Sequence, residues 1–266
     1  MLAAVTQVLA EPRAGFKPPG VDDFQWPCIW HVFGKTACIN KVALLYIAGA
    51  IIVFLLFFFA FRKAQIVPRG LQNLMEVAVD FVRNQIVMEV IGPEGLRFMP
   101  YLTTLFVYVF LTNVFGIIPF IQFPATGRMA IPMVLALLTW GLFIVVGIRK
   151  QGLGHYFKGT LFPPGVPAPI YILITPIEFV SVFVVRPLTL SIRLLANMIA
   201  GHLLLAIFFA GAAYLLAVPG TAIFGVASFA MGLALTGFEL FVALLQAYIF
   251  TILTAVYLAG SLEPAH

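Results

Sequence analysis

The chain has 266 residues, of which 62% are hydrophobic and only 9% are charged. Soluble domains carry about 25% charged residues, so this composition excludes a soluble globular protein and indicates an integral membrane protein. The excess of 15 Lys and Arg over 10 Asp and Glu does not indicate nucleic-acid binding, because the basic residues lie at the ends of apolar runs. We expect a single helical membrane domain, residues 42–266, after an N-terminal segment, residues 1–41.

The N-terminal segment contains few signals for regular structure. Its first residues form a short apolar run without a preceding basic stretch, which is not typical of a secretory signal peptide. Residues 16–40 are predicted to be a loop because they are rich in Pro, Gly and Asp. They hold the only two cysteines of the chain, Cys28 and Cys38, which are expected either to form a disulfide or to remain two thiols.

Five apolar stretches are long enough to cross the roughly 30 Å hydrocarbon core of a bilayer. A further stretch, residues 66–91, has apolar residues at helical spacing and Glu76 and Asp80 on another face, which predicts an amphipathic helix on the membrane surface. The predicted fold is therefore an all-α integral membrane protein, with spans at about 42–61, 98–121, 129–148, 168–218 and 221–259.

The last two spans are longer than a bilayer is thick, and Pro219-Gly220 forms the turn between them. At 1.5 Å per residue, residues 221–259 would extend about 57 Å, so this helix is expected to tilt strongly, bend or project from the membrane. Pro187 is expected to kink or interrupt the preceding stretch, because proline lacks the backbone N–H of a helical hydrogen bond.

Five spans place the two termini on opposite sides of the membrane. With the N-terminus external, eight basic residues flank the cytoplasmic side and five flank the external side. The positive-inside rule therefore favours an external N-terminus and a cytoplasmic C-terminus. This orientation puts both cysteines in an oxidising compartment, where a disulfide between them is chemically permitted.

Arg193 lies near the middle of an otherwise apolar helix. An arginine near the bilayer centre costs roughly 3 kcal/mol on insertion scales, and it cannot escape that cost by losing its proton. A permanent cation at this depth predicts a partner anion or an ion path. The alternative is a structural ion pair with another helix of the same chain.

The final turn also predicts which polar residues share a depth, because antiparallel helices align residues whose numbers add to about 439. Arg193 then matches Gln246, and Glu239 lies within about 3 Å of the level of His202. Asn197 is four residues from Arg193 and shares its face, whereas His202 is nine residues away and points to the opposite side. The central cation and the His202/Glu239 pair are therefore expected to serve different spaces.

Each of the other polar residues has a structural alternative. Asn113 and Gln246 are also typical of groups that hydrogen-bond between membrane helices. His202 and Glu239 can form a structural pair, and Glu178 can mark a solvated helix start.

The run from Arg193 through Asn197 to His202, followed by Glu239 and Gln246 on the last span, resembles subunit a of the F-type ATP synthases. The resemblance covers about residues 30–260, and Asn113 and Glu178 agree with it more loosely. It implies a non-catalytic stator that gives protons two offset half-channels to a ring of c subunits, coupling proton flow to rotation and ATP synthesis. It also implies peripheral-stalk b subunits as partners, a bacterial plasma membrane as location, and no cofactor or metal.

The same resemblance implies roles for individual residues. Arg193 would separate the two half-channels, His202, Glu239 and Asn113 would line the external one, and Glu178 would belong to the cytoplasmic exit. The expected proton pathway comprises Asn113, Glu178, Asn197, His202, Glu239 and Gln246. Two other classes stay open: a self-contained ion or solute transporter, although no inverted repeat is evident, and an intramembrane enzyme, although no nucleophile or metal cluster is evident.

Overall fold

The computed structural model describes residues 30–32, 37–39, 41–63, 65–118, 129–161, 170–218 and 220–262. Two short strands, β1 (Trp30–Val32) and β2 (Ala37–Ile39), pair antiparallel with His31 opposite Cys38. A loop was predicted here, but aromatic and β-branched residues in these strands favour extended pairing over coil. Cys28 lies outside the described residues, so a disulfide with Cys38 stays a prediction.

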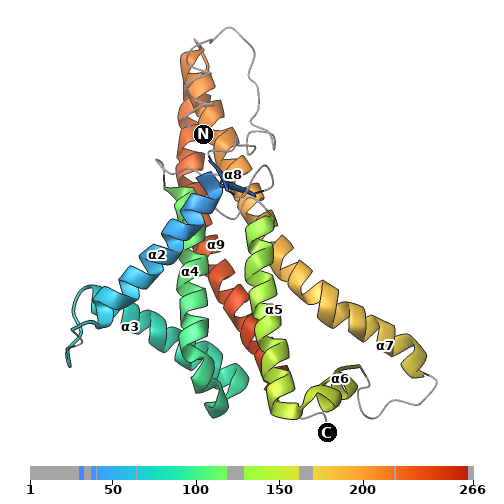
Figure 1. The fold of residues 1–266 in the computed structure, drawn as a ribbon. Helices are drawn as coiled ribbons and strands as arrows, with labels where there is room; N and C mark the ends of the chain where they lie inside the picture. Colours follow the sequence, from blue (N-terminus) through green and yellow to red (C-terminus); the bar gives the residue numbers. More distant parts are fainter. Residues whose placement is uncertain are drawn as a thin grey trace. The chain divides into compact units, whose positions relative to one another are not determined.

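The rest of the described chain is helical, which confirms the predicted all-α membrane fold (Figure 1). Five helical segments are long and apolar enough to cross a membrane. The helices are α2 (Lys41–Phe61), α3 (Leu71–Val82), α4 (Met99–Ile117), α5 (Ala130–Gln151), α6 (Leu153–Leu161), α7 (Tyr171–Val180), α8 (Arg186–Ala217) and α9 (Ala222–Leu262). Three shorter segments continue them: the π-helices η3 (Arg83–Ile91) and η7 (Ser181–Val185), and the 3₁₀-helix η4 (Pro93–Phe98).

The amphipathic helix begins at Leu71, five residues later than predicted, and continues through η3. Gly70 precedes it with φ of 59°, a left-handed conformation that an α-helix cannot include. Met75 and Val82 are buried, whereas Leu74, which the sequence placed on the same apolar face as Val82, is exposed. Its position on the membrane surface stays a prediction.

The short helix α6 lies in a region for which the sequence predicted no helix. Two glycines within it disfavour helix formation by about 1 kcal/mol each relative to alanine. The helix packs through Tyr156, which is buried, with its ring directly against Gly147 of α5. Burial raises the pKa of the Tyr156 phenol. The contact between Tyr156 and Gly147 therefore outweighs the weak helix propensity of the α6 residues.

The last helix, α9, has 41 residues. At 1.5 Å per residue it extends about 60 Å, twice the hydrocarbon thickness of a bilayer. The preceding span, α7 through α8, is continuous in helix but changes type at η7, which ends two residues before Pro187. The predicted interruption at Pro187 is thus a π-helical segment, and the strong tilt of both helices stays a prediction.

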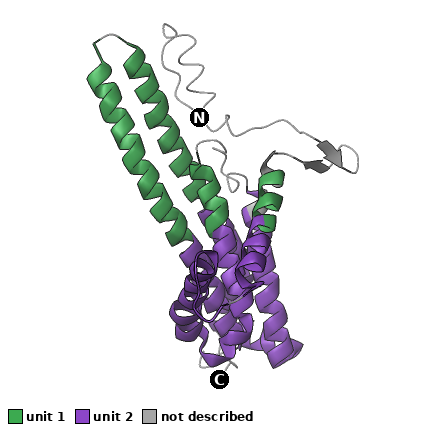
Figure 2. Ribbon diagram, turned by 90° about the vertical axis from the view of Figure 1, so that its left-hand side faces the viewer, with its two compact units in different colours: residues 1–51, 110–127, 195–246 green, residues 52–109, 128–194, 247–266 purple. Residues whose placement is uncertain are grey.

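The chain forms two compact units, coloured separately in Figure 2. Unit 1 comprises Met1–Ile51, Phe110–Gly127 and Leu195–Gln246. Within it, the later part of α8 and the first part of α9 lie side by side and antiparallel, because Ser228 donates a hydrogen bond to the carbonyl oxygen of Phe208 at 2.8 Å. The ring of Phe209 packs against Gly232, and Thr221 donates to the carbonyl of Leu215 at the end of α8. The single domain 42–266 stays a prediction.

Unit 2 comprises Ile52–Val109, Arg128–Leu194 and Ala247–His266. Its core joins α4, α5 and the end of α9. The hydroxyls of Tyr101 and Thr139 are 3.1 Å apart, and the rings of Phe143 and Tyr257 lie 5.7 Å apart between centroids. The first contact pairs two hydroxyls between helices, and the second packs aromatic area between helices.

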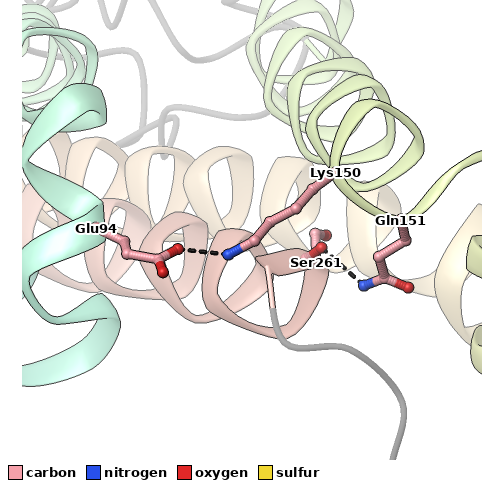
Figure 3. Close-up of polar contacts among 4 residues, drawn as sticks. All are labelled: Glu94, Lys150, Gln151 and Ser261. Carbon is pink, nitrogen blue, oxygen red and sulfur yellow. Dashed lines mark hydrogen bonds and ion pairs between the residues drawn. The ribbon is translucent and has the colours of Figure 1, made fainter.

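Two polar contacts hold the ends of three helical segments of unit 2 together (Figure 3). Lys150 of α5 forms an ion pair with Glu94 of η4, and the Gln151 amide donates to the carbonyl oxygen of Ser261 at 3.0 Å. The last four carbonyls of a helix lack intrahelical donors, so Gln151 satisfies one of those of α9. The ion pair is exposed to solvent, so it adds little stability by itself.

Candidate functional site

Arg193 lies on α8 in unit 2, on the face of the helix that turns away from the core. Its neighbours Leu190 and Leu194 are buried, with 2% and 0% of their surface exposed, whereas Arg193 and Ile192 are exposed. No carboxylate of the described residues forms an ion pair with Arg193. The alternative of a structural ion pair therefore finds no partner in the described part of the chain.

Two other charged residues of the same span also belong to unit 2. Glu178 is half-buried on α7 and forms no ion pair with any described residue. The guanidinium of Arg186 lies over the ring of Tyr257, 5.1 Å from its centroid. Arg186 is thus held by a cation–π contact, which distinguishes it from Arg193.

In unit 1, Glu239 of α9 reaches across to α8. A Cβ added to Gly201 would overlap both carboxylate oxygens of Glu239, so the carboxylate lies directly against the backbone of α8. Gly201 is adjacent to His202 in the chain, so the Glu239 carboxylate lies near the level of His202 along α8, as the sequence predicted. A side chain at position 201 would occupy the space that the carboxylate takes.

His202 points towards a different helix. Its imidazole lies against Gly116 of α4, where an added Cβ would overlap the ring, and the methyl group of Met198 packs at the same point. The Nε2 atom is buried and has no hydrogen-bond partner among the described residues. No direct ion pair with Glu239 is present in this part of the structure. Successive helix residues are about 100° apart, so the carboxylate beside Gly201 is not beside the His202 side chain.

Three carboxamides complete the predicted set. Asn113 is buried on α4, three residues before Gly116 and therefore about 4.5 Å along the axis from the His202 contact. Gln246 is buried on α9, and its Nε2 atom has no hydrogen-bond partner within the described ranges. Asn197 is half-buried on α8. Unit 1 thus holds Asn113, Asn197, His202, Glu239 and Gln246, whereas Arg193 and Glu178 belong to unit 2. The equal depth of Arg193 and Gln246 in the membrane therefore stays a prediction.

Sequence reasoning gave no role to Gly116 or to Gly201, although Gly201 lies in the run from Arg193 to His202 that carries the resemblance. Small residues let helices approach closely in membranes, so a glycine in the middle of a span is the signal that could have identified these two positions. Their partners were not predictable from that signal, because it does not say which side chain enters the space.

The side chains of His202 and Glu239 belong to types that can take up and release a proton, and those of Asn113, Asn197 and Gln246 can form hydrogen bonds with water. Across the described ranges, no three His, Cys, Asp or Glu side chains gather to bind a metal ion.

If the protein conducts protons as its sequence resemblance implies, we expect Gly201→Ala to reduce proton flux through the assembled complex roughly tenfold or more, because the new methyl group must displace the Glu239 carboxylate. The displaced atoms are the far end of a flexible side chain, so assembly should stay near normal. ATP-driven acidification of reconstituted vesicles measures the flux, and subunit content measures assembly.

Gly211→Ala is the matched control, because a Cβ there meets only Ser228 Oγ at an ordinary 3.7 Å. It makes the same substitution on the same helix and should leave proton flux unchanged. Equal flux in the two variants would mean that the position of the Glu239 carboxylate does not matter.

Comparison with known proteins identifies the family of the chain. Residues 42–259 match the family model of the ATP synthase A chain. The chain is 50% identical over 262 residues to ATP synthase subunit a of Frankia alni, covering 97% of this chain and 89% of the relative. It is 44% identical over 251 residues to that of Rhodococcus erythropolis, covering 93% and 91%, and 39% identical over 276 residues to that of a Nocardioides species, covering 100% of both. With the family model matching most of its length, the chain belongs to the ATP synthase A chain family.

Proposed function

We propose that the chain is the non-catalytic stator of an F-type ATP synthase and gives protons two offset half-channels to a ring of c subunits. Proton flow through the half-channels turns the ring and drives ATP synthesis. The observation that carries this proposal is Arg193, an exposed cation in an apolar span without an ion-pair partner among the described residues.

A guanidinium within a membrane span is costly and is almost always paired or faces a water-filled cavity. Since no described carboxylate of this chain pairs with Arg193, the compensating anion is proposed to come from another subunit. A ring carboxylate that has released its proton has the required charge. The permanent charge of Arg193 also disfavours a protonated, water-connected path past it, so protons must travel on the ring.

His202, Glu239 and Asn113 are proposed to line the external half-channel. His202 and Glu239 titrate there, and Asn113 hydrogen-bonds beside the His202 contact. Asn197 and Gln246 belong to the same pathway, and Glu178 lies on the cytoplasmic exit. His202 is nine residues beyond Arg193 on α8 and so points to the opposite side of the helix, which fits two spaces with different roles.

The orientation follows from the basic residues. The protein is a multi-pass membrane protein, and we infer an external N-terminus and a cytoplasmic C-terminus in a bacterial plasma membrane. The peripheral-stalk b subunits are proposed as further partners. Residues 1–41 would form an external segment before the membrane domain.

Copurification separates this proposal from a self-contained transporter. The chain should be extracted from native membranes together with a ring of small two-helix proteins, and the complex should pump protons when ATP is added. If the purified chain alone transported ions or solutes at the rate of the whole membrane preparation, the stator proposal would be wrong.

A further inference from the structure

The junction between η7 and α8 leaves the carbonyl of Val182 without a backbone donor. In the π-helical segment each N–H donates to the residue five positions back, and Arg186 donates to the carbonyl of Ser181. The next donor in this register would be residue 187, bonding to the carbonyl of Val182. Pro187 has no N–H, so that hydrogen bond cannot form.

Trp140 of α5 supplies the missing donor. Its indole Nε1 donates to the carbonyl oxygen of Val182 at 3.1 Å. The indole ring also meets the ring of Phe183 edge-on, with centroids 6.0 Å apart and planes at 74°. The Val182 side chain is buried, with 1% exposed, so its carbonyl lies where water is scarce and an unmet hydrogen bond is costly.

The same carbonyl decides between two helical registers. In a regular α-helix Arg186 would donate to Val182, four positions back, in place of Ser181. Because Trp140 donates to the Val182 carbonyl, that carbonyl keeps a hydrogen bond when Arg186 donates to Ser181, so the Trp140 bond offsets the cost of the π-helical register. The Pro187 ring acts in the same direction, since in an α-helix it would clash with the carbonyl of Phe183.

We propose that Trp140 is a positioning residue for Arg193, acting through the register of the η7–α8 junction. A change from the π to the α register shortens the span of each hydrogen bond by one residue. It rotates the following turns of α8 by about 100° relative to α7. Arg193 is six residues beyond Pro187, so this rotation would move it away from the exposed face of α8. It would also move Leu190 and Leu194 out of the buried positions that they occupy in this structure. This inference rests on the proposed role of Arg193.

The test uses two variants of the assembled complex that remove the indole N–H. Trp140→Phe keeps an aromatic ring against Phe183, and replacement of Trp140 by benzothienylalanine keeps the full ring shape with sulfur in place of N–H. Amide hydrogen exchange over residues 181–192 should become roughly fivefold faster in both variants, the factor expected for one net hydrogen bond. ATP-driven pumping should fall roughly tenfold and passive proton leak should rise.

Tyr101→Phe is the matched control, because it removes the hydrogen bond to Thr139, the neighbour of Trp140 on α5, and does not touch η7. It should change neither the exchange of residues 181–192 nor the leak. Unchanged exchange in both Trp140 variants would overturn the inference. Faster exchange with normal pumping would overturn the link to Arg193 while leaving the stator role, which Arg193→Ala tests separately, intact.

Discussion

Replacing Arg193 by alanine is expected to abolish ATP-driven proton pumping by the assembled complex, while passive proton leak persists or rises. The substitution removes the exposed cation that is proposed to attract a ring carboxylate and to block a direct proton path. Arg193 has no ion-pair partner among the described residues, so its loss strands no described carboxylate and assembly should be retained. Vesicles containing the purified complex, followed with a pH-sensitive dye, measure both pumping and leak.

Arg193→Lys should also fail substantially, because an ammonium group can lose its proton and has a different reach from guanidinium. Lys158→Ala is a suitable control, since it removes an exposed positive charge from α6, outside the predicted spans. Its pumping should be close to normal. Normal pumping with alanine at position 193 would refute the proposed role.

The second large effect is expected at His202 and Glu239. His202→Ala and Glu239→Ala should each slow proton entry roughly tenfold or more, because each removes a titratable group from the proposed external half-channel. The double variant should be little slower than the slower single variant, since the two groups lie at one level and are proposed to act in one relay. Proton flux at saturating ATP, compared across all four proteins, gives the coupling.

Ser228→Ala controls for the general effect of losing a polar contact between α8 and α9. It removes the hydrogen bond to Phe208 in the same unit, away from the level of His202, and should leave proton flux near normal. Multiplicative losses at His202 and Glu239 would instead indicate two independent sites.

Much of the fold was determined by the sequence itself. A helix in a bilayer must satisfy its backbone internally and span a known thickness, so apolar length alone predicted α2, α4, α5 and α9 to within a few residues. The turn after α8 likewise predicted that the Glu239 carboxylate would reach the level of Gly201 and His202. These are consequences of local pattern and of the constant rise of a helix.

Tertiary structure decided the rest, because it depends on contacts between residues far apart in sequence. Tyr156 forms α6 by packing against Gly147, despite weak local propensity. His202 shares a level with Glu239 but lies against Gly116 of α4, since direction around a helix axis has meaning only once its neighbours are in place. Pro187 predicted an interruption, yet only the approach of Trp140, 47 residues earlier, supplies a donor to the carbonyl that proline leaves unmet.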